Sequence, residues 1–554
     1  MDQSAHSFNV QPEALIPVLA VIGAGPKAAA IAVKAQVLKE LGLGNIDVVV
    51  IEKTKELAAN WAGHSGFTDG KGSLGTPPEK DVGFPYSSIF GSAVDFAMLR
   101  YSWQAYLIDR DNYSNWIDRG KPQPRHEIWA DYLRWALGLT SPSADEARVR
   151  PRVMEGRATR IELFEGRLKI EIKRPHTSEF IEADGVVFTG PGEPKTFGGS
   201  QPESSELIMD GRNYWQRIGV FEKLGPGRVA IIGGGETAAS IAVSLIERAP
   251  ELKVDIINRH GAVYSRGEGF DENRFFSNPD EWLEMDEAYR AEFIHHTDRG
   301  VFSVDALKRI ALAENVKPIS GEISEISEVG DKVVIDMSRA GIPTSLEYDR
   351  VIVALGFDPW AGSLEMFPIE LRPTISQEDL MQGIDYHLRV RFDSAPALIN
   401  SGINAHMPMV AGMAQGPGFP NLSCLGHVAD RILSLYLSAL HCKQARDDTW
   451  FWERVTPNGK SMVKEIGFAT REEAELSALM NGWRPFTRIT RDPNVMGGKL
   501  CIRGLRVTVR TILGLIASGH SPDEILKLYP YLEEEDLRES LAYGEEVEPP
   551  PVTE

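Results

Sequence analysis

Two glycine-rich segments constrain the fold of this chain more than any other feature, because each follows an apolar strand-like run and opens a helix-like run. The positions concerned are Gly23, Gly25 and Ala28 in the first segment and Gly233, Gly235 and Ala238 in the second, both spaced as G-x-G-x-x-G/A. In such a turn the first glycine permits the tight bend, the second lets a pyrophosphate approach the backbone, and the small third residue lets the helix pack on the strand. The N–H groups that begin the helix then face the phosphates. Two such turns predict two bound dinucleotides and favour an oxidoreductase.

The residue that closes the strand after each turn indicates which dinucleotide binds there. The run I46-D-V-V-V-I-E-K ends in Glu52 and Lys53, and a carboxylate at that position accepts hydrogen bonds from ribose hydroxyls, as in FAD or NAD. The run V254-D-I-I-N-R ends in Arg259, whose guanidinium suits a 2′-phosphate; the alternative is a solvated charge at a strand end. We therefore expect FAD at the first turn and NADPH at the second.

The composition indicates a globular protein of several domains. A chain of 554 residues with 42% hydrophobic and 25% charged residues is too long for one core, so two to four domains are expected. The net charge of −20 argues against general binding to nucleic acid or anionic membranes. No run reaches the length of a membrane span, and the N-terminus lacks the features of a secretory signal. The three cysteines, Cys424, Cys442 and Cys501, form no C-x-x-C pair, which fits a reducing cytoplasm.

The order of the patterned segments predicts an α/β chain of two Rossmann-like units, the NADPH unit inserted in the FAD unit, followed by a small, mainly helical, helix-turn-helix-like module. The predicted ranges are 15–222 and 351–440 for the two parts of the FAD-binding domain, 223–350 for the NADPH-binding domain, 441–483 for a connecting region, 484–544 for the module and 545–554 for an acidic tail. We expect helices over 27–40 and 425–440. The irregular stretch 60–95 is rich in Gly and Pro, and a segment of that length is usually functional.

Several further motifs are dispersed over about residues 15–440. They are G23-A-G-P, Trp61 with His64, Lys80-Asp81, R125-H-E-I-W-A-D-Y-L-R-W, Arg259, N273-R-F-F-S, A354-L-G-F and N421-L-S-C. In their order and spacing they resemble the flavin-dependent N-hydroxylating monooxygenases, whose known members hydroxylate the side-chain amine of ornithine or lysine for siderophore synthesis.

The resemblance implies that FAD, reduced by NADPH, forms a C4a-hydroperoxide with O₂ and that an uncharged amine attacks it. Such a site must exclude water, and partial desolvation lowers the pKa of the substrate amine. Because the flavin carries the chemistry, no side chain is assigned a catalytic role. The expected partners are a small amine or amino acid, O₂ and further copies of the chain in a homo-oligomer.

The resemblance also implies which residues hold each ligand. For the substrate these are Lys80, which would grip a carboxylate, with Asn273 and Ser423. For FAD they are Gly23, Gly25, Pro26, Lys27, Ala28, Glu52, Lys53, Trp61, His64 and Gly356. For NADPH they are Gly233, Gly235, Glu236, Thr237, Ala238 and Arg259.

Three departures from the family pattern lie on the substrate side. Leu74-Gly75 replaces a Met-Gln pair, Gly300 replaces an Asn that contacts substrate, and Trp61 is not adjacent to His64. The amine that this chain hydroxylates need therefore be neither ornithine nor lysine.

The segment I489 to L513 resembles an antitoxin-like family, the domain of unknown function 433, with Leu500 and Leu505 in place of the usual Pro and Thr. Ser521 and Glu524 predict a capping box at the start of a helix, and a last helix is expected over 533–543. Seven basic residues and one acidic residue between Arg484 and Arg510 leave contact with DNA open. We expect the module to serve instead in oligomerisation or in capping the flavin domain.

Two alternatives remain open at this stage. The first is another flavin enzyme, which oxygenates carbon or sulfur or acts as an NADPH oxidase, although the F-x-G-x-x-x-H stretch of Baeyer–Villiger-like enzymes is missing between the turns. The second is a flavin-based redox sensor whose C-terminal module binds DNA or a protein. His295-His296 has no carboxylate at ligand spacing, so no metal is predicted.

Overall fold

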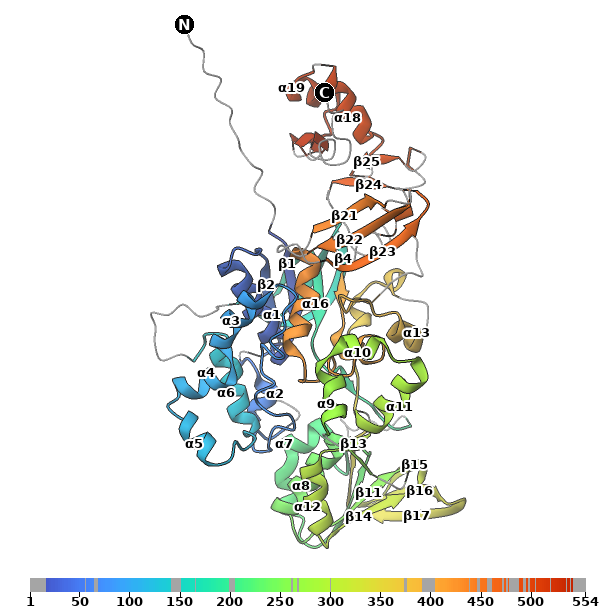
Figure 1. The fold of residues 1–554 in the computed structure, drawn as a ribbon. Coiled ribbons are helices and arrows are strands. Elements are labelled where there is room, and N and C mark those ends of the chain that lie inside the picture. The colour runs from blue at the N-terminus through green and yellow to red at the C-terminus, as the bar shows by residue number, and fades with distance from the viewer. Residues whose placement is uncertain are drawn as a thin grey trace.

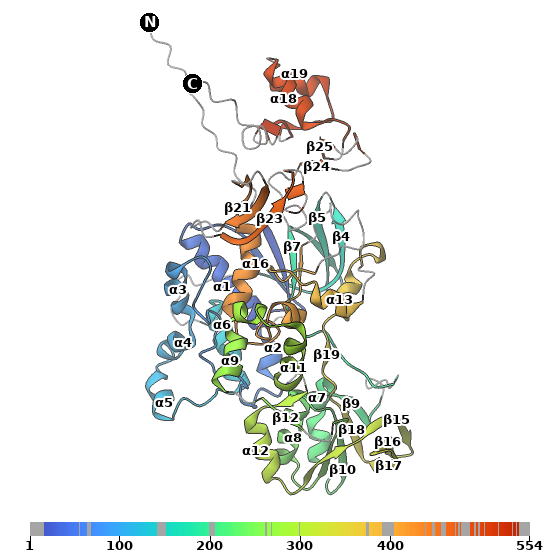
Figure 2. The ribbon, with the colours of Figure 1, turned by 45° about the vertical axis from the view of Figure 1, so that its right-hand side comes forward.

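The structure is a computed structural model with three parts along its length (Figures 1 and 2). One parallel sheet lies in the middle, a second lies at one end, and small helices of the C-terminal module lie at the other. The described residues are 16–54, 56–63, 68–140, 151–164, 166–198, 205–260, 263–266, 269–298, 300–372, 376–390, 404–437, 439–445, 449–455, 461–470, 473–474, 477, 488–491, 495–496, 499–503, 505–518, 520–534, 536–538 and 540–541.

The middle sheet is parallel and is formed by segments from both halves of the chain. Its order is β20 (Ala405–His406), β7 (Gly185–Phe188), β1 (Val18–Ile22), β2 (Asp47–Glu52) and β3 (Arg152–Glu155). The inner strands β7, β1 and β2 are nearly continuous apolar runs because both faces are covered, as is usual for parallel sheets, whereas the edge strand β3 is largely exposed. Helices α1 (Pro26–Glu40) and α16 (Leu425–Leu437) pack together, and Lys34 and Asp430 form a buried ion pair of 2.6 Å between them. An antiparallel sheet of β4 (Arg157–Phe164), β5 (Arg167–Lys173) and β6 (Ser178–Ala183) adjoins this unit.

The second sheet is also parallel. Its order is β14 (Val316–Ser320), β11 (Lys253–Asn258), β10 (Arg228–Ile232), β18 (Arg350–Val353) and β9 (Ile208–Asp210). Beside it lie the helices α7 (Gly211–Glu222), α8 (Glu236–Arg248) and α12 (Val304–Leu312). The same unit carries an antiparallel sheet of β15 (Glu322–Val329), β16 (Lys332–Arg339) and β17 (Ile342–Tyr348). The chain leaves the first sheet after β7 and returns at β20, so the predicted α/β fold with an inserted unit is confirmed.

Two predicted boundaries need correction. The range 15–222 includes β9, which pairs with β18 of the second sheet, so the inserted unit begins near Ile208 rather than at 223. The helix expected over 425–440 ends at Leu437, and a strand begins at Ala439. An apolar run such as 425–440 gives no signal for this change, because its last residues suit either structure.

Short helices extend from both units. On the first unit these are α2 (Ala59–Ala62), α3 (Ser92–Met98), α4 (Trp103–Asp109), α5 (Tyr113–Asp118) and α6 (His126–Ala136). From the second unit α9 (Phe270–Ser277), α10 (Pro279–Leu283) and α11 (Glu287–Thr297) reach back to the first. The indole of Trp282 anchors α10 there, since its Nε1 donates to the Met413 carbonyl over 3.0 Å.

The connecting region contains a three-stranded antiparallel sheet that we did not predict from the sequence. It consists of β21 (Ala439–Gln444), β22 (Trp450–Val455) and β23 (Ser461–Phe468). The module contains the hairpin β24 (Ile489–Arg491) and β25 (Leu500–Ile502), then α18 (Val509–Ala517) and α19 (Pro522–Leu528). The predicted capping box is present, because Ser521 and Glu524 each bond the other's backbone N–H. Among the described helices of the chain, none is long and apolar enough to cross a membrane.

Candidate active site

The first glycine turn joins β1 to α1 at the carboxyl end of the middle sheet. Gly23 has φ +95°, and a Cβ there would lie 2.7 Å from Thr189 Oγ1, so only glycine fits. Gly25 differs, because its φ of −90° suits any residue and a Cβ would meet nothing within 4 Å. Pro26 occupies the first turn of α1, and Ala28 is buried against the sheet. The turn therefore leaves open space beside the backbone of Gly25.

Glu52 and Lys53 lie beside this turn at the end of β2. The Glu52 carboxylate accepts a hydrogen bond of 2.8 Å from the Ala24 N–H, which fixes it at the bend. Lys53 is exposed. Lys27 is turned inward, and its ammonium donates to the carbonyls of Pro420 (2.9 Å) and Asn421 (3.2 Å). Burial lowers the pKa of Lys27 to about 8. These two bonds tie α1 to the segment before α16, and the role of Lys27 at FAD stays a prediction.

The other residues predicted at FAD are less closely grouped. Trp61 is half-buried and packs edge-on against His126, with ring centroids 5.1 Å apart. Gly356 has φ +83° in the turn after β18, and its carbonyl accepts from the Lys195 N–H. His64 lies outside the described residues.

The second glycine turn joins β10 to α8 and repeats the pattern of the first. Gly233 has φ +146°, and a Cβ there would lie 2.2 Å from the Ala354 carbonyl oxygen. Gly235 has φ −109°, and the atoms nearest to its Cβ position, both of Gly300, are 3.9 Å away. Ala238 is buried in the core behind the turn.

Three further residues predicted at NADPH flank this turn. Thr237 is half-buried in the first turn of α8, and Glu236 accepts a hydrogen bond of 2.7 Å from the Ser303 N–H. Arg259 is exposed directly after β11, at the same edge of the sheet as the turn. The structure therefore leaves the Arg259 guanidinium accessible to a ligand.

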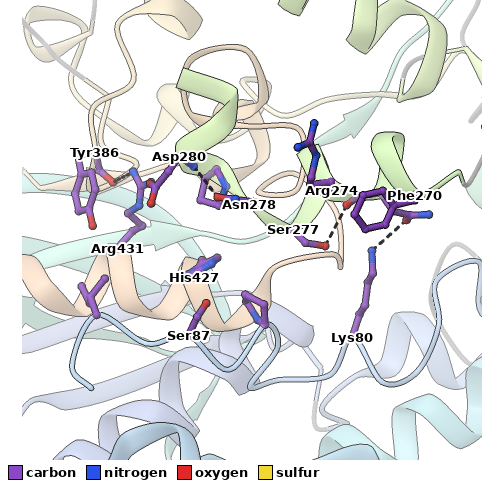
Figure 3. Close-up of a pocket in the computed structure, with 14 residues that line it drawn as sticks. Lys80, Ser87, Phe270, Arg274, Ser277, Asn278, Asp280, Tyr386, His427 and Arg431 are labelled. Atoms are coloured by element: carbon purple, nitrogen blue, oxygen red, sulfur yellow. Dashed lines mark hydrogen bonds and ion pairs between the residues drawn. The ribbon is translucent and has the colours of Figure 1, made fainter. Parts of the chain in front are cut away.

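A pocket of about 760 Å³ lies between the loop around Lys80 and helices α9 and α10 (Figure 3). Lys80 Nζ donates to Asn273 Oδ1 over 3.2 Å, so two of the three predicted substrate residues meet in its wall. Ser423, the third, is buried, and its N–H donates to Asn421 Oδ1. Ser423 is not among the pocket-lining residues. Gly300 also lies elsewhere, against the second glycine turn.

The pocket includes charged and polar residues that sequence reasoning missed. They are Ser87, Asn278, Asp280, Tyr386, His427 and Arg431, whereas Arg274 and Ser277 belong to the N273-R-F-F-S motif. Burial lowers the pKa of His427 to about 4, so this imidazole is neutral near pH 7. One signal was available, since D430-R431 is an adjacent charged pair within the otherwise apolar run of α16.

No cluster of three or more metal-ligating side chains is found among the described residues. The histidines of the His295-His296 pair instead pack edge-on against each other, with centroids 5.2 Å apart, near the ring of Tyr264.

Two parallel-sheet units, each with a phosphate-binding type of glycine turn, define a two-dinucleotide oxidoreductase. The family model for L-lysine 6-monooxygenase/L-ornithine 5-monooxygenase matches residues 17–359. An L-lysine N6-monooxygenase from Mycobacterium sp. (strain MCS) is 36% identical over 76% of this chain and 95% of its own length. A solved lysine monooxygenase from Nocardia farcinica is 30% identical with TM-score 0.62, over 75% of this chain and 98% of that one. The ornithine hydroxylase of Pseudomonas aeruginosa shares the fold at 19% identity, with TM-score 0.58, over 76% of this chain and 99% of that one.

The chain therefore belongs to the L-lysine 6-monooxygenase/L-ornithine 5-monooxygenase family. It is a flavin-dependent N-hydroxylating monooxygenase, as the sequence motifs predicted. FAD and NADPH, the predicted cofactors, agree with structures of the family, among them a Kutzneria ornithine N-hydroxylase with reduced FAD, NADP⁺ and L-ornithine.

The resemblance of the C-terminal module to the domain of unknown function 433 is confirmed. Residues 489–544 match the family described as protein of unknown function (DUF433). Two of its seven basic residues are used internally, because Arg488 and Arg503 both pair with the buried Asp536, at 3.0 and 2.9 Å. The charges of these two arginines are therefore compensated within the module.

Proposed function

We propose that this chain N-hydroxylates the side-chain amine of lysine or a lysine-like compound, using FAD, NADPH and O₂. The observation that carries the proposal is the meeting of Lys80 and Asn273 in a pocket between the two dinucleotide units. Lysine is preferred to ornithine because the relatives that match most of this chain are named lysine N6-monooxygenases.

The second glycine of each turn supports the two dinucleotides. At Gly25 and Gly235 neither the backbone angles nor the packing requires glycine. A pyrophosphate lying against the backbone does require it, since a side chain would occupy the same space. Glu52, fixed at the first turn, would accept from the ribose of FAD, and Arg259 would bind the 2′-phosphate of NADPH.

When bound, FAD supplies the activation of O₂ after reduction by NADPH. The residues of this chain must bind the substrate, orient it and hold its amine neutral. In our proposal the Lys80 ammonium holds a substrate carboxylate by a charge-assisted hydrogen bond, and Asn273 orients Lys80. Ser423 stays a prediction.

The charges of the pocket favour the reactive form of the amine. The cations Lys80 and Arg431 line the wall with one exposed carboxylate, Asp280, while Arg274 in the same wall pairs with Glu281 at 2.8 Å. Neighbouring cations and partial burial both disfavour a further ammonium, so they lower the pKa of the bound amine. An uncharged nitrogen is needed because only its lone pair can attack oxygen.

The test uses FAD-loaded protein with NADPH, O₂ and a panel of lysine, ornithine and cadaverine. We expect hydroxylamine product with lysine above the others, measured together with peroxide release. Peroxide alone from every amine would contradict the proposal and favour the NADPH oxidase alternative.

A further inference from the structure

The pocket has a second cationic end, formed by Arg431 of α16. Figure 3 shows Arg431 and Tyr386 at one end of the pocket and Lys80 at the other. The proposed grip on an amino-acid carboxylate by Lys80 and Asn273 uses only the first end. The proposed function therefore gives no role to the second cationic end.

Arg431 is held in place by neutral groups. Arg431 as a whole residue is 3% exposed, and its guanidinium carbon lies 3.7 Å from the centroid of the Tyr386 ring. Its Nη1 donates to Gln415 Oε1 over 3.0 Å and to the Tyr386 carbonyl over 3.3 Å. Neither acceptor carries a charge, so these bonds orient the guanidinium without neutralising it.

The nearby carboxylates do not neutralise it closely either. Asp430 is taken by the Lys34 ammonium at 2.6 Å and by the Ser88 hydroxyl at 2.9 Å. Asp280 Oδ1 lies 3.8 Å from Arg431 Nη2, and the Asp280 side chain is 88% exposed. An ion pair at that distance with an exposed partner is weak and screened by water. Burial accordingly lowers the pKa of Arg431.

A buried guanidinium in the wall of a pocket is most stable when an anion reaches it. The pocket has room for such a group, because cavities of about 300–1,000 Å³ usually hold ligands larger than a free amino acid, and this one measures about 760 Å³. Ser87 and Asn278 add polar side chains to the lining.

We propose that Arg431 forms a second subsite, for a carboxylate, through which the pocket accepts a lysine-like amine whose α-nitrogen carries an acidic group. A lysine-like unit would lie at Lys80, and an acidic group joined to its α-nitrogen would reach Arg431 Nη2. Asp280 holds this guanidinium loosely until the substrate carboxylate replaces it. The identity of the amine-bearing unit rests on the proposed function; the subsite rests on Arg431 and its surroundings.

The test compares two ligands that differ in one carboxylate, Nα-succinyl-lysine and Nα-butyryl-lysine, by titration calorimetry of the full chain. We expect the succinyl compound to bind at least about tenfold more tightly, the usual effect of a hydrogen bond between charged groups. Arg431→Gln, which keeps a donor for Gln415, should reduce this ratio to about one. Equal affinities in the native protein, or a ratio that survives Arg431→Gln, would overturn the subsite.

Asp280→Asn gives a second measurement that does not disturb the buried helix. Removing the competing carboxylate should strengthen binding of the succinyl compound severalfold and leave the butyryl compound unchanged. An unchanged or weaker affinity for the succinyl compound would count against the inference. If neither compound is preferred but lysine is hydroxylated, the subsite is wrong and the proposed function stands. If the preference is found but no amine yields hydroxylamine, the subsite stands and the proposed function is wrong.

Discussion

Lys80 and Asn273 are 193 positions apart in the chain, yet Lys80 Nζ donates to Asn273 Oδ1 over 3.2 Å. Lys80 belongs to the loop of the first unit, and Asn273 lies on α9, which extends from the second. The contact therefore depends on how the two units close on each other, and both residues line the pocket that results.

Replacing Lys80 by Met should weaken substrate binding more than catalysis. The change keeps the length of the side chain but removes the ammonium, and a hydrogen bond to a charged group is worth about 1.5–3 kcal/mol. We expect the KM for the amine to rise roughly 10- to 100-fold, with a smaller change in kcat. Lys71→Met, at an exposed position earlier in the same loop, is the matched control. An unchanged KM would remove Lys80 from the substrate site.

Gly25→Ala and Gly23→Ala should have different effects, although the residues are two positions apart. Gly25 has ordinary backbone angles and open space at Cβ, so Gly25→Ala should keep its thermal midpoint as apoprotein and lose affinity for FAD. Gly23 has φ +95°, and a Cβ added there would lie only 2.7 Å from Thr189 Oγ1. Gly23→Ala should therefore also lower the thermal midpoint of the apoprotein. Flavin fluorescence titration and calorimetry measure the two effects. Normal FAD affinity in Gly25→Ala would contradict the assigned phosphate contact.

Arg259→Ala should reduce the preference for NADPH over NADH. The exposed guanidinium follows β11 beside the second glycine turn, where it can bind a 2′-phosphate. We expect the KM for NADPH to rise about tenfold or more while that for NADH changes little. Lys253→Ala, an exposed cation at the opposite end of β11, should alter neither constant. An equal rise in KM for both nucleotides would show that Arg259 does not bind the 2′-phosphate.

The stability of the first unit should fall as the pH drops below about 6.5, the ordinary pKa of His406. Burial lowers the pKa of His406 to about 4, while the unfolded chain still takes up a proton at the higher pH. Because the unfolded state then binds more protons, stability is lost as the pH falls from about 6.5 to about 4, on the order of 3 kcal/mol for this residue.

His406→Gln should flatten that slope, as measured by urea unfolding at several pH values. Its side chain bonds the His387 carbonyl and the Tyr436 hydroxyl, both at 2.7 Å, so some loss of stability at pH 7 is also expected. His176→Gln, in an exposed turn, serves as the comparison. A slope identical to that of the native protein would contradict the prediction.

Asp536→Asn should loosen the C-terminal module without affecting the flavin domain. The buried carboxylate pairs with Arg488 and Arg503, and removing one partner of a buried pair costs about 3–5 kcal/mol. Hydrogen exchange of β25 and α18 in the full chain should become faster. Glu534→Gln, at an exposed neighbouring position, should leave the exchange unchanged. Protection that persists in Asp536→Asn would mean that this charge cluster does not hold the module together.

The sequence predicted the local elements well because their determinants lie within a few residues. The spacing of Gly23 and Gly25 defines a turn, and Ser521 with Glu524 defines a helix start, whatever the rest of the chain does. The boundary near Ile208 was misplaced because a three-residue strand is defined by its partner β18, which comes much later in the chain. For the same reason, the sheet of β21, β22 and β23 was not predicted.

The candidate site also combines features set by nearby residues with features set by contacts between distant segments. By itself the sequence determined two glycine turns and an α/β chain, since apolar periodicity and short-range spacing encode them. Its dispersed motifs also carried the resemblance to the N-hydroxylating monooxygenases. Only the tertiary structure decided that Lys80, Asn273 and Arg431 share one pocket, and that the Lys27 ammonium bonds the Pro420 carbonyl. These relationships arise where three distant segments meet, and the position of each side chain there depends on the packing of all the others.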